Sequence, residues 1–476
     1  MKVDYPKIIQ GGMGVAISDW RLAQTVSKIG QLGVVSGVAL EIVMVRRLQD
    51  GDEGGHVRRA LQAFPFPDMA RRAVEKFYIP GGKADDQPYA NVPLHKMIGT
   101  KKVHELCILG NFVEVFLARE GHDRDVGINY LEKIQLPHLP SIYGAMLAGV
   151  AYVIMGAGIP TMIPGVLDGL SRHESVSYGI NVSGSKPGDD TLTRFDPQNF
   201  MEGDHAPLAR PRFLPIIASN VLAVTMLRRS NGTVDGFVIE GPTAGGHNAP
   251  PRGALQVNER DEPVYGEKDV VNLSKIRDLG LPFWVAGGSA SAERLQEVLE
   301  AGGAGIQVGT AFALCDESGL AQEYKRGLLG EAVAGTARVV TDRHASPTGF
   351  PFKVAQLDGS FSDEKTYLSR IRVCDLGYLR EVYRKDDGKL GYRCASEPIA
   401  NFVAKGGIES DTIGRKCICN ALMTNAGHPQ IQKDGAVEKA LLTAGDDLAE
   451  IARFIPEGQT SYSAKDVIDT LLSIES

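Results

Sequence analysis

Residues 285–310 read VAGGSASAERLQEVLEAGGAGIQVGT, and this stretch decides the fold. It contains two short apolar strands, each ending in a small-residue turn, joined by one amphipathic helix. The turns Gly287-Gly288-Ser289 and Gly309-Thr310 place bare backbone N–H groups at adjacent strand ends, with room for a phosphate. The last two βα units of a TIM barrel hold a phosphate in this way. The stretch therefore predicts a parallel α/β barrel that binds a mononucleotide such as FMN.

Six further regions support the barrel, since short apolar runs, mostly β-branched, recur along the chain and alternate with helical patterns. The eight predicted strands match a (β/α)8 barrel. A doubly wound sheet remains an alternative, because short apolar runs do not show whether the sheet closes into a barrel. The eight predicted strands are Pro6–Gln10, Gly33–Ser36, Val126–Leu131, Ala151–Met155, Phe213–Ala218, Gly236–Glu240, Pro282–Ala286 and Gly305–Val308.

The chain of 476 residues is longer than a usual single domain, so we expect a barrel and an appended region. The barrel is predicted over residues 1–315. It carries an insertion at 39–102, expected to form a helical lid over its top face, and a polar, proline-rich one at 184–212, expected to shape the substrate pocket. Residues 316–476 are predicted to form a mainly helical C-terminal appendage.

The composition favours small molecules as the binding partners of this protein. Hydrophobic residues make up 43% of the chain and charged residues 23%, which is ordinary for a globular protein. The net charge of −7 and the lack of a long basic run argue against nucleic acid and anionic membranes as partners. The N-terminus lacks the apolar core of a signal peptide, and no stretch reaches the length of a membrane span. We therefore expect a cytoplasmic protein.

Two more glycine-rich turns follow predicted strands. Gly11-Gly12-Met13-Gly14 ends the first strand, and its lack of bulk would let a flat ring lie against the backbone. The loop Glu240–Asn248 follows the sixth strand and presents His247 among very small residues. An imidazole at that position can reach a substrate and titrate near neutral pH, so His247 is a candidate general base; the alternative is a structural histidine.

The stretches IIQGGMG, IEGPTAGGHNAP, VAGG and GIQVGT, in this order, resemble the signatures of the nitronate monooxygenase (2-nitropropane dioxygenase-like) flavoproteins. The same superfamily includes FMN-dependent enoyl-acyl carrier protein reductases. The resemblance covers roughly residues 1–315. It implies non-covalent FMN, with the phosphate on the turns of the last two strands and the ring near Gly12 and Met13. It also implies that His247 removes a proton from the substrate carbon, after which the flavin is reduced and then reoxidised by O2.

Two departures from the family pattern leave alternatives open. Glu240 stands where the nitronate enzymes usually carry Gln. The lid, residues 109–135 and the C-terminal region look more like the trans-acting enoyl reductases of polyunsaturated fatty acid and polyketide synthases. Such an enzyme would take electrons from NADPH and reduce acyl chains on an acyl carrier protein. A third reading is a non-catalytic flavin-binding scaffold that docks a synthase.

Within GINYLEKIQ, Asn129 and Lys133 are predicted to alternate to one face of the third strand and to meet the flavin pyrimidine edge. A lysine there would stabilise the anionic reduced flavin, unless it only closes the barrel mouth to water. The predicted cofactor-binding residues are thus Gly11, Gly12, Met13, Asn129, Lys133, Gly245, Gly246, Gly287, Gly288, Ser289, Gln307, Gly309 and Thr310.

Four of the six cysteines lie in the C-terminal region: Cys374, Cys394, Cys417 and Cys419. Four thiolates suit zinc or an iron–sulfur cluster. However, the spacing contains neither a C-x2-C knuckle nor a ferredoxin run, and buried free thiols are common. The sequence therefore predicts no metal, with these four residues as the only alternative.

Overall fold

The computed structural model describes residues 5–201, 203 and 205–473. Eight parallel strands form its centre and coincide with the eight predicted runs: Ile8–Gln10 (β1), Gly33–Ser36 (β2), Val126–Leu131 (β3), Tyr152–Gly156 (β4), Arg212–Ile217 (β8), Phe237–Glu240 (β9), Phe283–Ala286 (β10) and Gly305–Val308 (β11). Their order in the sheet is β1-β11-β10-β9-β8-β4-β3-β2.

Backbone hydrogen bonds between the two ends of this order close the sheet. The N–H of Gln10 in β1 donates to the carbonyl of Leu32 at 2.9 Å, and the N–H of Leu32 donates to the carbonyl of Ile8 at 3.1 Å. Leu32 lies directly before β2 and pairs with Ile9 in the parallel sense. The predicted TIM barrel is therefore confirmed, and the doubly wound sheet is excluded.

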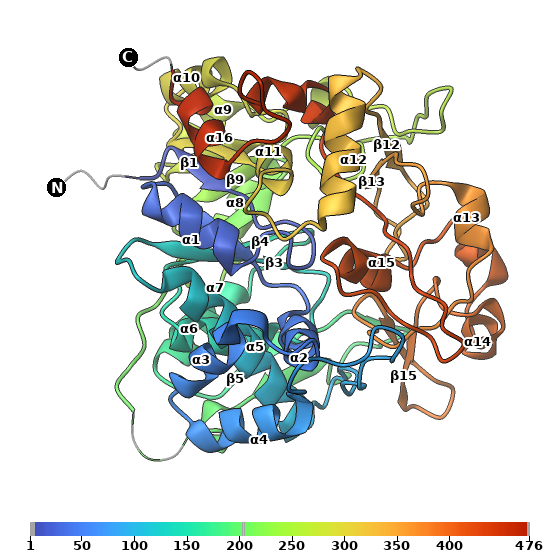
Figure 1. Cartoon of the computed structure of the whole chain (residues 1–476). Coiled ribbons are helices and arrows are strands. Elements are labelled where there is room, and N and C mark those ends of the chain that lie inside the picture. Colours follow the sequence, from blue (N-terminus) through green and yellow to red (C-terminus); the bar gives the residue numbers. More distant parts are fainter. Residues whose placement is uncertain (1–4, 202, 204, 474–476) are drawn as a thin grey trace.

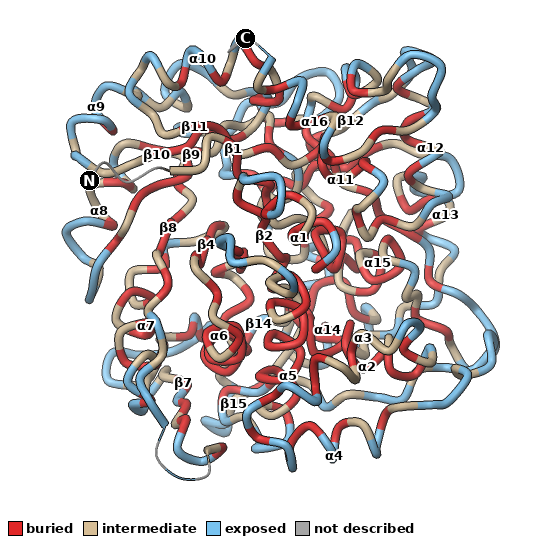
Figure 2. The backbone as a smooth tube through the Cα atoms, turned by 60° about the vertical axis from the view of Figure 1, so that its left-hand side comes forward, coloured by how far each residue is buried: buried red, intermediate tan, exposed pale blue. Residues whose placement is uncertain are grey.

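Helices cover the outside of the barrel, and apolar side chains fill its interior. Three of the helices begin at side-chain caps, Asp19, Ser219 and Ser291, whose oxygens accept backbone N–H groups of the first turn. Figure 2 shows the buried backbone along the strands and the exposed backbone in the outer loops. The helices are α1 (Trp20–Lys28), α5 (Lys101–Arg119), α6 (His138–Leu147), α7 (Ile163–Ser171), α8 (Asn220–Arg229), α9 (Leu273–Arg277), α10 (Ala292–Glu300) and α11 (Thr310–Ala313). The interior cluster comprises Ile9, Leu32, Val34, Tyr152, Ile154, Leu214, Val238, Trp284 and Ala286.

The first insertion is helical, as predicted, but most of it is not a lid. It forms α2 (Leu40–Gln49), η1 (Glu53–Gly55), α3 (His56–Gln62) and α4 (Pro67–Phe77). All three α-helices pack against α5 on the outside of the barrel, because their apolar faces have that long helix as a partner. Only Ala39, at its start, lines the central pocket.

The second insertion also differs from expectation. It contains the strand β7 (Leu192–Phe195), which pairs antiparallel with β5 (Val176–Gly179), and it directly follows the two-residue strand β6 (Val182–Ser183). None of its described residues lines the central pocket, so the prediction that it shapes that pocket was wrong. The expectation rested on loop length alone, which does not report where a loop folds.

The C-terminal region contains both helices and short strands. It spreads along one side of the barrel and returns to it in α16, beside α1 and α10 (Figure 1). Its strands, absent from the prediction, form the β12-β13 hairpin and a three-stranded sheet of β15, β14 and β6. Its elements are α12 (Gln322–Val333), β12 (Val339–Asp342), β13 (Phe352–Ala355), α13 (Glu364–Leu368), β14 (Glu381–Arg384), β15 (Leu390–Arg393), α14 (Ile399–Ala404), η4 (Glu409–Thr412), α15 (Ile418–Asn425), η5 (Asp446–Phe454) and α16 (Ala464–Leu471).

Among the described residues, no helix has both the length and the apolar character needed to cross a membrane.

Candidate active site

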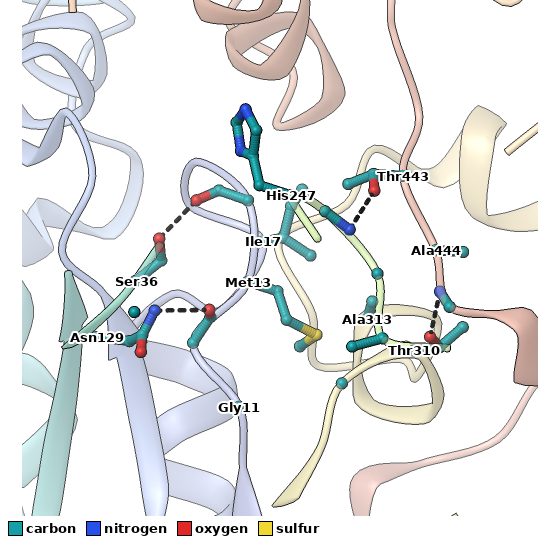
Figure 3. A pocket seen from close by; sticks show the side chains of 18 of the residues that line it. Gly11, Met13, Ile17, Ser36, Asn129, His247, Thr310, Ala313, Thr443 and Ala444 are labelled. Carbon is teal, nitrogen blue, oxygen red and sulfur yellow. Dashed lines mark hydrogen bonds between the residues drawn. The ribbon is translucent and has the colours of Figure 1, made fainter. Parts of the chain in front are cut away.

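One large cavity opens where the barrel strands end. It has a volume of about 1790 Å³ including its open mouth. The loops after β1, β9, β10 and β11 line it, together with residues of the C-terminal region (Figure 3). The carboxyl ends of the strands are the functional face of a TIM barrel, so this cavity is the candidate active site. Thirteen predicted site residues line it: Gly11, Gly12, Met13, Asn129, Gly245, Gly246, His247, Gly287, Gly288, Ser289, Gln307, Gly309 and Thr310.

Glycine is required in two of these turns. Gly287 and Gly288 adopt φ angles of +87° and +58°, in the left-handed region that L side chains rarely enter. In the first turn, a Cβ atom on Gly12 would lie 2.4 Å from the Cβ of Asn129. The turns therefore expose backbone at two separate parts of the cavity wall.

Polar side chains also reach the cavity. The amide Nδ2 of Asn129 donates to the carbonyl of Gly12 at 3.4 Å, which links β3 to the first turn (Figure 3). Gln307, in β11, has a buried Oε1 atom with no hydrogen-bond partner among the described residues. A buried acceptor without a partner is costly unless a ligand supplies the donor. Gln307 thus points to a ligand with an N–H or O–H group.

His247 connects the barrel to the C-terminal region. Its Nε2 atom lies 2.7 Å from the hydroxyl oxygen of Ser346, and its ring packs edge-on against Phe352 at a centroid distance of 4.8 Å. Desolvation in the pocket wall, and then the nearby Lys133 ammonium, lower the pKa of His247 well below its ordinary value. The imidazole is therefore neutral at pH 7 and able to accept a proton.

Lys133 is the predicted site residue that the structure does not bring into the cavity. It lies in a turn beyond the end of β3, so the alternation of a strand does not apply to it. Its buried Nζ has no hydrogen-bond partner among the described residues and lies 3.9 Å from the ring centre of Phe350. Burial lowers the pKa of Lys133 to about 7, against the opposing pull of Glu240 and Glu132. The expectation that Asn129 and Lys133 share one face of a strand was wrong, because β3 ends at Leu131.

Glu240 ends β9 and lines the cavity. Burial raises the pKa of its carboxyl group to about 7, while the Lys133 ammonium acts in the opposite direction. Glu240 therefore supplies the cavity wall with a carboxyl group that titrates near neutral pH.

Sequence reasoning missed the contribution of the C-terminal region to the cavity. The hydroxyl of Thr443 accepts the N–H of Gly246 at 2.8 Å, and the hydroxyl of Thr310 accepts the N–H of Gly445 at 2.9 Å (Figure 3). Tyr378 lines the cavity too, and its hydroxyl donates to buried Glu41 at 2.6 Å. No motif marks these residues, because their role depends on contacts across more than a hundred positions of the chain.

Comparisons with known proteins match part of the barrel. Residues 211–345, which contain the loops after β9, β10 and β11, match the family model of nitronate monooxygenase. A nitronate monooxygenase of Pseudomonas aeruginosa is 37% identical over 117 residues, which are 25% of this chain and 32% of the relative. One of Paraburkholderia phytofirmans is 29% identical over 161 residues, 33% of this chain and 42% of the relative. The chain thus matches less than half the length of these nitronate monooxygenases.

Solved structures similar to this protein include FabK from Thermotoga maritima, with a TM-score of 0.48 and 16% identity, covering 99% of this chain and 93% of that one. The enoyl reductase domain of MlnA from Bacillus amyloliquefaciens has a TM-score of 0.46 and 11% identity, covering 99% and 96%.

Proposed function

We propose that this protein is an FMN-dependent oxidoreductase that oxidises a nitronate or a similar carbon acid, with O2 as the electron acceptor. The observation that carries the proposal is the convergence of four glycine-containing turns, after β1, β9, β10 and β11, on one cavity that also contains His247. The family match of residues 211–345 supports the same class of chemistry.

The residues of the cavity fit a flavin nucleotide. We assign the phosphate to the turns after β10 and β11, where Gly287, Gly288, Ser289, Gly309 and Thr310 offer backbone N–H groups and hydroxyls without bulk. We assign the ring to Gly11, Gly12, Met13, Asn129 and Gln307, with the free Oε1 of Gln307 as acceptor for a ring N–H, and with Gly245 and Gly246 on the other wall. When bound, FMN takes electrons from the substrate and passes them to the acceptor.

His247 is the proposed general base. Its neutral imidazole can take the proton from the substrate carbon. Ser346 holds Nε2, so we assign the proton transfer to Nδ1. In this role Ser346 is a positioning residue, because it fixes the ring through a hydrogen bond and does not itself face the reacting carbon.

Lys133 and Glu240 are proposed to set the charge of the cavity. Lys133 acts through the electric field of its ammonium group. This group does not line the cavity, but it lowers the pKa of His247. Glu240 contributes a carboxyl group whose charge changes near pH 7.

One observation favours a second candidate function, an NADPH-dependent enoyl reductase that acts on acyl chains bound to an acyl carrier protein. The cavity continues beyond the glycine turns between apolar side chains of the C-terminal region, including Leu328, Leu379, Leu422 and Leu442. Apolar walls of this kind suit an acyl chain better than a small nitronate.

Anaerobic stopped-flow spectroscopy distinguishes the two functions. We expect propyl nitronate to bleach the flavin and O2 to restore its colour. Bleaching by NADPH, followed by reoxidation with a crotonyl thioester, would replace this function by the enoyl reductase. A flavin-loaded protein that responds to neither would contradict both enzymes and leave a binding scaffold.

We propose a division of the chain at residue 315, with the barrel supplying the cofactor site and residues 316–476 closing it. We place the protein in the cytoplasm, a compartment that its six free cysteines favour.

A further inference from the structure

Four cysteines from separate segments line one small cavity in the C-terminal region. Cys374 lies in the loop after α13, Cys394 directly follows β15, Cys417 is the N-cap of α15, and Cys419 lies in the first turn of that helix. All four line the same cavity, which shares Cys419 with the wall of the large cavity described above. Up to 45 positions separate these residues in the sequence, so the fold itself gathers them.

The backbone around the cavity favours the ionised form of each thiol. Gly377 and Ser396 lower the pKa of Cys374 and Cys394, respectively, against the larger effect of burial. Asn420 and Leu379 act in the same way on the pKa of Cys417 and Cys419. Backbone groups that favour thiolate are also found around metal–thiolate centres.

The surroundings carry the charge that a thiolate site needs. The guanidinium groups of Arg380 and Arg370 act on Cys374 and Cys417, respectively, and favour their ionised forms. Asn420 is 1% exposed and lines the cavity, and its Oδ1 atom has no hydrogen-bond partner among the described residues. One buried acceptor without a partner therefore lies in the cavity wall.

The spacing of the sulfurs argues against a single metal ion. Among the described residues, Glu41, His95 and Cys107 form a compact group whose possible ligand atoms lie within 4.8 Å of one another. The four cysteines do not form a group that compact. Glu41 already accepts hydrogen bonds from His95 and Tyr378, both at 2.6 Å, so that group is satisfied without an ion. Sulfurs around a single zinc ion, at about 2.3 Å from the metal, would lie about 3.8 Å apart. Cysteines that bind a four-iron cluster lie farther apart, because each ligates a different iron.

We propose that Cys374, Cys394, Cys417 and Cys419 together bind an iron–sulfur cluster of the [4Fe–4S] type, next to the large cavity. The inference rests on the four thiols that line one cavity, and it does not depend on the reaction proposed above.

The test is metal and acid-labile sulfide analysis of the full-length protein, purified without oxygen. We expect about four iron and four sulfide per chain, and an electron paramagnetic resonance signal after reduction with dithionite. This measurement needs no variant. About one zinc per chain without iron would overturn the cluster and assign a single ion to the same thiols. Less than half an equivalent of either metal would overturn the site altogether.

Variants locate the metal. Cys394→Ser and Cys417→Ser should each reduce bound iron at least severalfold, whereas the control Cys315→Ser should retain it. Cys315 is fully buried, and its thiol donates to the carbonyl of Phe312 in the barrel, away from the four cysteines. Thermal unfolding of each variant identifies any that fail to fold. Full iron content in a folded Cys394→Ser Cys417→Ser double variant would contradict the assignment.

Discussion

The barrel and the C-terminal region are stabilised by different kinds of interaction. In the barrel, parallel strands in continuous register enclose an apolar interior, and capped helices cover it. The C-terminal region has short elements, and buried polar contacts hold its segments together. One is the ion pair of Arg370 and Glu438, whose side chains are 6% and 2% exposed. Another is Lys416 with Glu364, at 2.9 Å.

The difference teaches where functional residues are visible in a sequence. A barrel strand ends in a turn at a predictable place, so its glycines and His247 can be assigned from local pattern. In the C-terminal region, the partners of a contact lie far apart in sequence. That region nevertheless contributes Ser346, Thr443 and Gly445 to the same cavity.

The largest expected effect tests whether the two regions fold together. Phe454 in η5 and Phe237 in β9 belong to one hydrophobic core, with 2% and 0% exposure. Phe454→Ala and Phe237→Ala should each lower the free energy of unfolding by about 3–5 kcal/mol, because each leaves a large cavity. Urea unfolding followed by fluorescence and circular dichroism should show one coincident transition. Two separate transitions, with only one moved by Phe454→Ala, would make the C-terminal region an independent domain.

The next effect concerns the residue that joins the regions. His247→Ala should retain flavin and slow turnover about a hundredfold or more, since it removes the proposed base. Ser346→Ala, on the C-terminal side of the same hydrogen bond, should slow turnover only about tenfold, because it loosens the ring without removing it. Single-turnover kinetics measure both rates. An unchanged rate in His247→Ala would exclude the imidazole as base.

A third prediction concerns the barrel alone. Gly287→Ala should weaken FMN binding about tenfold or more, because its φ of +87° disfavours a side chain and a Cβ atom would lie 3.0 Å from the backbone N of Ala244. Gly280→Ala is the matched control, with φ of +77° and open space around its Cβ position. It should show similar strain and unchanged affinity in fluorescence titrations. Equal affinities for the two variants would remove the phosphate assignment.

The smallest effect depends on pH. The pKa of Lys133 is about 7 in the fold and near 10.5 in the unfolded chain, so the charged form is disfavoured in the native state. This cost is absent above pH 10.5, increases as the pH falls, and is complete below pH 7. Lys133→Met should therefore raise the thermal midpoint by about 2 °C or more at pH 6 and by less at pH 10. A larger increase of the thermal midpoint at pH 10 than at pH 6 would contradict the cost of burying the Lys133 ammonium.

Much of the barrel could be predicted because its strands are short apolar runs that end in small residues. Thirteen site residues could be found for the same reason. Lys133 was misplaced because β3 ends at Leu131, and a period of two has no meaning beyond that residue. The four cysteines show the opposite limit: their spacing matches no metal motif, yet the fold brings them to one cavity. Glu240 was recognised only as a departure from a pattern, since its pKa depends on burial that a sequence does not display.

The most direct test of the central claim is an equilibrium titration of the purified full-length protein, stripped of ligands, with FMN. The claim is that glycine turns of the barrel and the C-terminal segment that closes over them form one flavin site. We predict saturation at one FMN per chain, with affinity about tenfold weaker or more in Gly287→Ala and unchanged in Gly280→Ala. A colourless protein that binds no FMN at any concentration tested would contradict the account.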